Sequence, residues 1–372
     1  EGAAPSLDLS RRLSYNSLGC AVCGGSSSYI AIIYHRWKSA WPDARPLCAG
    51  PSVPQPLRKG RNAMFGHRPE GRRVRDVDPI VQITPYLMPM RCDAQVFLDY
   101  DVEYEPLMRY IAKKSREGVK ITFMEILIAS FVRGVSQVPE VNRFIMNKQF
   151  YNRRELTASF TLLMDTDDGS IEENTVKIFF DPTDTIYDVS ARIKDMVQKN
   201  RRAETSGFAV KLASAVLKIP LLPSLAAGLV RLLDRYGLLP KALLDGLPFH
   251  TSMFITNNAS IGLMRVYHHI YNFGDTSMFI SMGTPQRGYS VDAGGNVVRK
   301  CTLPVGVTVD ERVCGGAVYA KLFAVMKNCL RHPEQLETPP EKVFYNKGCE
   351  FHVPKPENVF HPAGSTEGSV TA

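Results

Sequence analysis

Helix-like and strand-like segments follow one another between residues 95 and 331 without strict strand–helix–strand alternation, and this order limits the folds open to the chain. β-branched and aromatic residues bounded by turn residues predict strands over 95–102, 141–145, 157–164, 175–180, 252–256, 277–281 and 301–309. Apolar residues recurring every three or four positions predict helices over 106–117, from 122 onward, 184–200 and 315–331. This succession favours an α/β fold of the α+β kind, with a mixed sheet.

Two of these helices have clear boundary signals. Pro106 stands in the first turn of one helix and Gly118 follows its last turn, where proline and glycine are favoured. Thr122 and Glu125 have the spacing of a capping box, which predicts the start of the next helix. Neither GxGxxG nor GxxxxGK[ST] occurs, which argues against dinucleotide and Walker-type phosphate sites.

Positive charge is concentrated at the start of the chain. Residues 1–78 contain 12 Lys and Arg against 6 Asp and Glu, so only +2 of the formal net charge of +8 belongs to the rest. A nearly neutral body lacks the broad basic face that nucleic-acid binding needs, and we expect no nucleic-acid partner. Residues 1–75, rich in Gly, Ser, Pro and Arg, are predicted to form a basic, largely unstructured arm.

The remaining chain divides into a body at 76–335, with a helical insertion at 207–247, and a C-terminal tail at 336–372. In the insertion, Leu, Ala and Val dominate among three prolines and scattered Lys and Arg. It is either a helical hairpin that covers the core or forms an oligomer contact, or an amphipathic segment that lies on a membrane surface.

The cysteines and apolar runs bear on location. Eight scattered cysteines indicate a reducing compartment. Cys20 and Cys23 form a CxxC pair without a second pair at zinc spacing, so no metal site is predicted. The apolar runs 29–34 and 219–230 are too short to span a bilayer, and a cytoplasmic location is expected.

Residues 301–320, CTLPVGVTVDERVCGGAVYA, hold the polar residues best placed for chemistry. A predicted strand enters Asp310-Glu311-Arg312, passes through a glycine turn and continues as a helix. Such an elbow holds polar side chains at a sheet edge beside the positive end of a helix. Acyl transfer needs a base for the attacking thiol or hydroxyl and a donor for the tetrahedral oxyanion, and an elbow of this kind can supply them.

This segment resembles the closing motif DHRxxDG of the catalytic domains of dihydrolipoamide acyltransferases, the core subunits of 2-oxoacid dehydrogenase complexes. It is also similar to chloramphenicol acetyltransferases. In the motif, the histidine is the general base and the later Asp helps to organise the site. Here Asp310, Arg312 and Gly316 match, whereas Glu311 stands at the histidine position and Gly315 at the second Asp position.

A second match lies upstream. Residues 253–262, MFITNNASIG, resemble the family's FTISNLG-type strand and turn, and the hydroxyl that stabilises the oxyanion there corresponds to Thr256. Residues 277–283 and 78–93 also resemble family segments, the latter from stand-alone bacterial members, so that the resemblance covers roughly residues 75–335. It implies a chloramphenicol acetyltransferase-like acyltransferase fold, and a homotrimer or higher homo-oligomer with its site between subunits. It also implies coenzyme A, as acyl-CoA substrate, entering one end of a channel.

Two family parts are not found in the sequence: a lipoyl domain with its lysine turn and a peripheral-subunit-binding domain. No lipoyl attachment site is therefore expected. This separates the chain from an ordinary core subunit of a pyruvate-type complex.

Glu311 leaves two outcomes open. A solvated glutamate is a poorer base than histidine by about two pKa units, but burial raises the pKa of a carboxyl toward neutrality and makes it a usable base. Alternatively, Glu311 forms a structural ion pair with Arg312 or another arginine, and catalysis is lost. His268 and His269 follow Thr256 by 12 and 13 residues, and His269 is taken as a substitute base; the alternative is a packed loop pair. Cys314 is either an acyl-carrying thiol with a lowered pKa or a buried small residue.

The expected function is therefore CoA-dependent acyl transfer to a small thiol, amine or hydroxyl acceptor, at a rate reduced by the altered motif. Glu311, Thr256 and His269 are the expected catalytic residues. Two alternatives stay open: a catalytically inactive trimeric scaffold or binding module of the same fold, and a peripheral membrane protein that uses residues 207–247.

Overall fold

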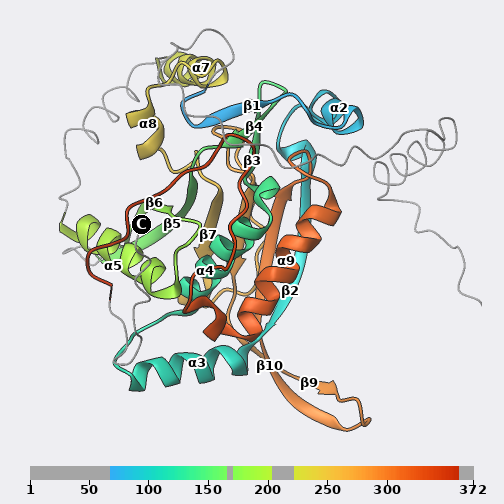
Figure 1. Ribbon diagram of the computed structural model, residues 1–372, viewed down its shortest axis with the longest axis vertical. Coiled ribbons are helices and arrows are strands. Elements are labelled where there is room, and N and C mark those ends of the chain that lie inside the picture. The colour runs from blue at the N-terminus through green and yellow to red at the C-terminus, as the bar shows by residue number, and fades with distance from the viewer. Residues whose placement is uncertain (1–67, 166–170, 203–221, 360–372) are drawn as a thin grey trace, which may run out of the picture. The chain divides into compact units, whose positions relative to one another are not determined.

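The computed structural model describes residues 68–165, 171–202 and 222–359 (Figure 1). Its described helices are α2 (Pro79–Leu87), α3 (Tyr104–Arg116), α4 (Phe123–Gln137), α5 (Ile186–Arg202), α7 (Leu222–Arg235), α8 (Lys241–Gly246) and α9 (Gly316–Arg331). Its described strands are β1 (Gly71–Val74), β2 (Gln95–Glu103), β3 (Arg143–Met146), β4 (Gln149–Arg153), β5 (Leu156–Asp165), β6 (Ile171–Phe180), β7 (Met253–Asn257), β8 (Met278–Met282), β9 (Gln286–Val291) and β10 (Val297–Asp310).

The strands form two sheets in the described part of the chain. The larger has the order β2-β10-β8-β7-β5-β6, and β9 pairs with the first part of β10. Strand β7 is parallel to both β5 and β8, whereas the other pairings are antiparallel. A smaller antiparallel sheet has the order β1-β4-β3. Helices together with a mixed sheet confirm the predicted α/β fold class.

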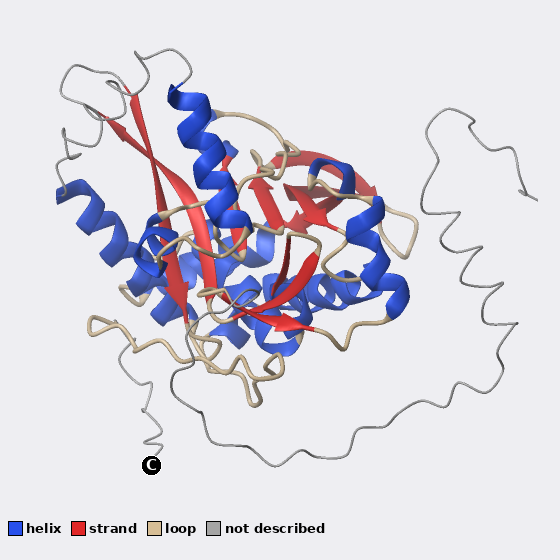
Figure 2. Ribbon diagram, turned by 90° about the horizontal axis from the view of Figure 1, so that it is seen from above, coloured by secondary structure: helices blue, strands red, loops and turns tan. Residues whose placement is uncertain are grey.

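One face of the larger sheet carries the main core. Side chains alternate along each strand, so Met253 and Ile255 of β7, and Met278 and Ile280 of β8, point to the same face. Helices α4, α5 and α9 pack on this face (Figures 1 and 2). The predicted capping box starts α4, where the Thr122 N–H donates to Glu125 Oε2 (2.6 Å) and the Glu125 N–H to Thr122 Oγ1 (3.3 Å).

The opposite face is covered by an extended segment, residues 261–275, rather than by a helix. Ile270 of this segment packs with Phe254 and Phe279 in a second, smaller apolar cluster. The backbone of Val266 exchanges hydrogen bonds with the Ser281 hydroxyl of β8. A Cβ atom at Gly306 would lie 2.6 Å from the Val266 carbonyl oxygen, so only glycine lets the segment approach β10 this closely.

The ordered body starts before the predicted boundary at residue 75. Gly71–Val74 form β1, which pairs with β4. Arg68 is buried and donates to Asp234 Oδ1 (2.7 Å). Three of the four residues of β1 are glycine or arginine, so the segment has no alternation of apolar and polar residues. For this reason the sequence pattern placed it in the predicted arm. Residues 1–67 of the predicted arm lie outside the described residues.

The predicted tail is also wrong in its first part, because residues 337–359 pack on the body. The Phe344 N–H donates to the Ser136 carbonyl (2.8 Å), and Lys355 Nζ lies 3.0 Å from both Asp184 and Asp188 carboxylates. Cys349 is buried. The contacts come from a segment without helix or strand, so they produce no regular spacing of apolar residues from which packing could be predicted. Residues 360–372 lie outside the described residues.

The predicted helical insertion at 207–247 is described only from residue 222, where it forms α7 and α8. Its first part, like the predicted turn at 165–169 apart from Asp165, lies outside the described residues. No helix in the described ranges is both long and apolar enough to cross a membrane.

Candidate acyl-transfer site

The elbow between β10 and α9 is fixed by a buried ion pair. Arg312 donates from Nε to Asp310 Oδ1 (2.8 Å) and from Nη2 to Oδ2 (2.7 Å), and both side chains are almost fully buried. A third bond runs from Arg312 Nη1 to the Met88 carbonyl (2.9 Å). The buried Tyr319 hydroxyl of α9 donates to the Asp310 carbonyl (2.9 Å). These bonds hold the polypeptide on both sides of residue 311.

Glu311 itself is not clamped. Its N–H donates to the Ala94 carbonyl (3.0 Å), while its half-buried carboxylate has no ion pair within the described residues. Burial raises the pKa of this carboxyl, and the neighbouring negative charge of Asp310 adds to the rise. The anticipated ion pair with Arg312 is absent from this part of the chain because Asp310 occupies the guanidinium on two sides.

Cys314 is a core residue and not an exposed thiol. It is buried below the elbow, and burial raises its thiol pKa to about 12. The thiolate needed to carry an acyl group is therefore disfavoured. Of the two alternatives, the buried small residue is the one that the structure bears out. Burial outweighs proximity to the start of α9.

Thr256 lies far from Glu311 within one chain. It pairs with Ser281 of β8, which pairs with Gly306 of β10. Glu311 follows Gly306 by five residues, or about 17 Å of strand, and two strand spacings of about 4.8 Å separate β7 from β10. The two residues are thus roughly 19 Å apart. The half-buried Thr256 donates to Asn258 Oδ1 (3.2 Å), and its hydroxyl does not reach the Glu311 carboxylate of the same chain.

The histidine pair lies at the Glu311 end of the sheet. The Ile270 N–H donates to Gln95 Oε1 (3.1 Å), and Gln95 pairs with Asp310. His268 stacks on Phe279 with ring centroids 4.0 Å apart, which matches the packed-loop alternative. His269 is exposed and touches Tyr271 only edge-on (4.8 Å). Of the predicted catalytic residues, the fold therefore brings Glu311 and the backbone around His269 to one end and leaves Thr256 at the other.

A basic cavity lies next to the elbow, and the sequence analysis did not predict it. It has a volume of about 350 Å³ and is lined in part by Arg312. The other cations in its lining are Arg91, Lys148, Arg231 and Arg235. They come from segments far apart in the chain, so no local pattern could predict the cluster.

Most of these cations have no carboxylate partner among the described residues. Arg91 is buried, and its guanidinium donates to the Asn272 and Ile145 carbonyls (3.3 and 3.1 Å). Burial lowers the pKa of this guanidinium. Arg235 donates to the amide oxygen of Asn147 (2.9 Å). The only acid in the lining, Asp234, is already bound by Arg68 and His250. The cavity therefore suits a ligand with several negative charges.

Across the described ranges, no group of three or more His, Cys, Asp or Glu side chains is arranged to hold a metal ion.

Among solved structures, the chain is similar to a probable dihydrolipoamide acetyltransferase from Listeria monocytogenes, with 12% identity, a TM-score of 0.44, and coverage of 71% of this chain and 92% of that one. It is also similar to dihydrolipoamide acetyltransferase of Azotobacter vinelandii, at 14% identity and a TM-score of 0.40 over 68% and 87% of the chains. A chloramphenicol acetyltransferase shows 8% identity and a TM-score of 0.42 over 70% and 99%.

No protein-family model matches the chain, and no curated protein sequence matches it. The similarities concern overall fold at low superposition scores.

Proposed function

We propose that the protein transfers an acyl group from acyl-CoA to a small thiol, amine or hydroxyl acceptor, with Glu311 as general base. The observation that carries this proposal is the half-buried Glu311 carboxylate, free of ion pairs among the described residues, on an elbow fixed by the Asp310–Arg312 pair. Glu311 takes the acceptor's proton as the acceptor attacks the thioester carbonyl. The tetrahedral intermediate then expels the CoA thiolate, which receives that proton.

Two further parts complete the proposed site. Thr256 of a neighbouring copy donates its hydroxyl to the oxyanion, since one chain leaves it roughly 19 Å from Glu311. The basic cavity beside Arg312 receives the phosphates of CoA, whose negative charges match Lys148, Arg231 and Arg235. The assembly that this requires is a homotrimer, as the resemblance of the motif implies.

Glu311→Gln tests the base directly. Thiol release from acetyl-CoA, followed with a thiol reagent and a panel of small acceptors, is expected to fall by about 10²–10⁴-fold. Glu334→Gln, an exposed glutamate after α9, serves as the matched control and is expected to match wild type. If wild type releases no thiol above background with any short acyl-CoA, the protein is instead the inactive scaffold of the same fold.

The pH profile gives a second readout of the same residue. Glu311 must be ionised to act, so the rate rises with pH through its pKa, and burial places this acid limb above that of an ordinary glutamate. Glu311→His restores the motif residue and is expected to keep activity while moving the limb toward the histidine range, near 6.5. An unchanged profile in Glu311→His would assign the base elsewhere, and His269→Ala then tests the nearest substitute.

The need for a second copy is tested on the face covered by residues 261–275. Met264 and Leu263 are 58% and 49% exposed there, next to Ile261 at 56%, and a contiguous exposed apolar patch is a candidate subunit contact. Met264→Glu is expected to give monomers in sedimentation velocity and to abolish thiol release. Monomeric wild type with full activity contradicts the shared site.

A second candidate function rests on α7. Leu225, Leu229 and Leu232 lie on one face of this helix and are 69%, 57% and 52% exposed, with Arg231 and Arg235 beside them. Such a face can lie in the headgroup region of an anionic membrane. Flotation with vesicles of phosphatidylcholine and phosphatidylserine is expected to be lost when the three leucines become serine, and kept in Leu263→Ser. No flotation of the intact protein eliminates this candidate.

A further inference from the structure

A separate cavity lies along β10, between the edge strand β2 and helix α9, and its lining on β10 runs from Lys300 to Val307. Its volume is about 330 Å³, within the range of small-molecule sites. Its inner wall is apolar and comes from both sheet and helices. The residues that form this wall include Tyr100, Val305, Val307, Phe323, Met326 and Leu330.

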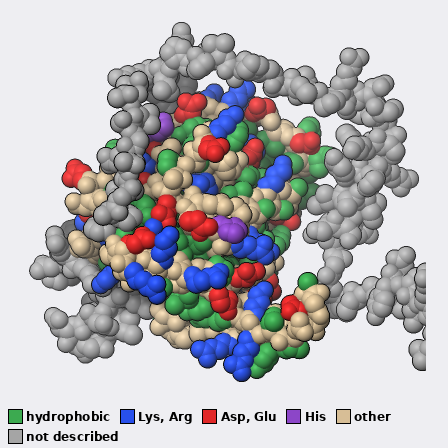
Figure 3. Space-filling view, turned by 60° about the horizontal axis from the view of Figure 1, so that its bottom comes forward, with side chains coloured by type: hydrophobic (Ala, Val, Ile, Leu, Met, Phe, Trp, Pro, Cys, Tyr) green, Lys and Arg blue, Asp and Glu red, His purple; other side chains and the backbone are tan. Residues whose placement is uncertain are grey.

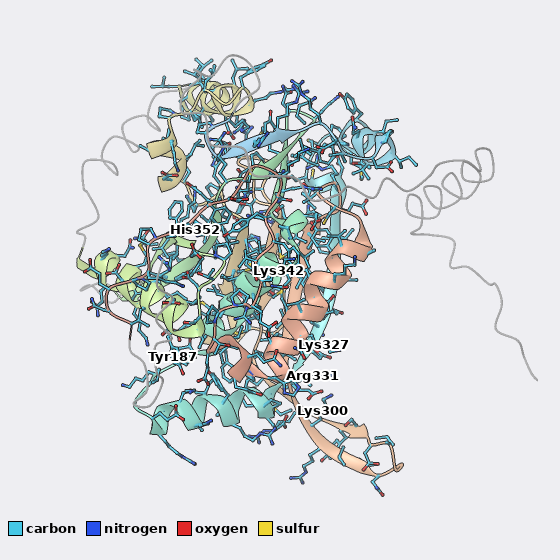
Figure 4. The ribbon with its side chains drawn as sticks, in the orientation of Figure 1. Tyr187, Lys300, Lys327, Arg331, Lys342 and His352 are labelled. Atoms are coloured by element: carbon cyan, nitrogen blue, oxygen red, sulfur yellow. The ribbon has the colours of Figure 1, made fainter. Side chains whose placement is uncertain are left out.

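The mouth of this cavity is cationic. Lys327 and Arg331 on α9 and Lys300 on β10 lie together beside it (Figure 4). Figure 3, in which the bottom of the molecule in Figure 1 is turned forward, shows Lys and Arg side chains interspersed with acidic and apolar ones on its lower half. Arg331 and Lys300 share a single carboxylate, Glu103, at 3.3 and 3.9 Å. Lys327 has no ion pair within the described residues, so three cations face one acid.

The remaining acids in the lining do not neutralise this mouth. Asp99 and Asp101 bind Arg265 (3.3 and 3.2 Å), which belongs to the segment covering the opposite face of the sheet. A neighbouring cavity shares Glu103 and Arg331 and adds two cations, Arg109 and Lys113, against one further acid, Glu334, so an excess of positive charge extends beyond the mouth. An apolar interior with a cationic rim on one side selects an apolar chain that ends in an anion.

We propose that this cavity binds a carboxylate-headed aliphatic chain, with the chain between β2 and α9 and the carboxylate at Lys327, Arg331 and Lys300. The site is distinct from the elbow, because no residue of its lining falls between 308 and 316 and its cationic mouth at Lys300 is 11 residues, or about 36 Å of extended chain, before Glu311. It does not depend on acyl transfer. The carboxylate adds a charge-assisted contact at each cation that a neutral head group lacks.

The test is isothermal titration of the full chain with decanoate, decanol and inorganic phosphate. Decanoate is expected to bind roughly tenfold more tightly than decanol, since only decanoate brings a charged head to the cations. Phosphate, which has no chain, is expected not to displace decanoate, because any phosphate bound in the basic cavity beside Arg312 lies outside this site. Phosphate displacing decanoate, or equal binding of decanol, overturns the proposal.

Matched variants locate the site. Lys327→Glu is expected to weaken decanoate roughly fivefold and decanol less than twofold, whereas Lys321→Glu, exposed on the same helix but away from the cavity, changes neither. Val102→Phe narrows the cavity and is expected to abolish binding of both. Equal loss in the two lysine variants overturns the assignment. Glu311→Gln is expected to bind decanoate as wild type does. Decanoate binding therefore tests this site whether or not the protein catalyses the proposed acyl transfer.

Discussion

The two ends of β10 both carry ion pairs, but the pairs differ in burial. At the carboxyl end, Asp310 and Arg312 are 1% and 3% exposed and make two bonds of 2.7 and 2.8 Å. At the other end, Glu103 is shared by Arg331 and Lys300 at 3.3 and 3.9 Å, with side chains 36–48% exposed. A carboxylate and a cationic side chain thus form a tight buried pair at one end of β10 and longer, solvent-exposed pairs at the other.

This difference indicates what each end can do. A buried bidentate pair fixes a backbone turn, which lets Glu311 stand unclamped at a defined position. Exposed cations that share one acid are free to bind another anion at little cost, because their mutual pairing is weak. One strand therefore offers a rigid polar turn at one end and an adaptable cationic mouth at the other.

Arg312→Met, which removes the buried pair at the carboxyl end of β10, should cause the largest loss of stability. It leaves Asp310 buried without its partner, and the free energy of unfolding is expected to drop by about 3–5 kcal/mol. Urea denaturation followed by circular dichroism measures it. Arg312→Lys, which keeps the charge but cannot make the two parallel bonds, should lose less. A loss below about 1 kcal/mol for Arg312→Met would mean that the elbow is held by other contacts.

The sequence predicted the parts of this architecture that depend on local pattern. Strands β7 and β8 follow from β-branched and aromatic runs, and α4 follows from the Thr122–Glu125 capping box, because both signals lie within a few residues. Strand β1 and residues 337–359 were missed, since they are fixed by partners from elsewhere in the chain, such as β4 and Ser136.

The candidate site was predictable only in part. The resemblance of the motif predicts roles for Glu311 and Thr256. Their separation in one chain follows from strand order and register, which a single sequence does not encode locally. The basic cavity joins Arg91 to Arg312 across 221 positions in the chain, 312 minus 91, and has no signature in either neighbourhood.

Thr308 is a buried polar residue of β10, near its carboxyl end, that has no ion pair within the described part of the chain. It is 1% exposed, and its hydroxyl has no hydrogen bond among the described residues. Its register partners are Phe97 and Phe279, so its surroundings are apolar. Thr308→Val removes an unpaired buried hydroxyl and is expected to raise the free energy of unfolding by about 1 kcal/mol. Thr308→Ser, which keeps the hydroxyl but loses the methyl group, is the control. A destabilised valine variant would show that the hydroxyl has a partner, such as a neighbouring copy.

Ionisation of Glu311 should destabilise the folded protein, whereas ionisation of an acid in an ion pair stabilises it. Its pKa is raised in the folded state, so folding favours the protonated form and the ionised form opposes folding. Wild type is therefore expected to lose stability relative to Glu311→Gln as pH rises through the folded pKa, by a small amount because the carboxyl is half exposed. Chemical denaturation of both proteins on either side of this pH measures the difference. A glutamine variant that is less stable at high pH would indicate that ionised Glu311 has a favourable partner.

Arg331→Met should have the smallest effect of the series. The guanidinium is 48% exposed and lies 3.3 Å from a carboxylate that Lys300 also approaches, so removing it leaves Glu103 solvated and still near a cation. The free energy of unfolding is expected to change by less than about 0.5 kcal/mol, against about 3–5 kcal/mol for the same substitution at residue 312. Adding salt should reduce even this small change, because exposed charges are screened and the buried pair is not. If Arg331→Met instead approaches the loss seen at 312 and resists salt, the cationic mouth is as rigid as the elbow, and its cations are not free to receive an anionic head group.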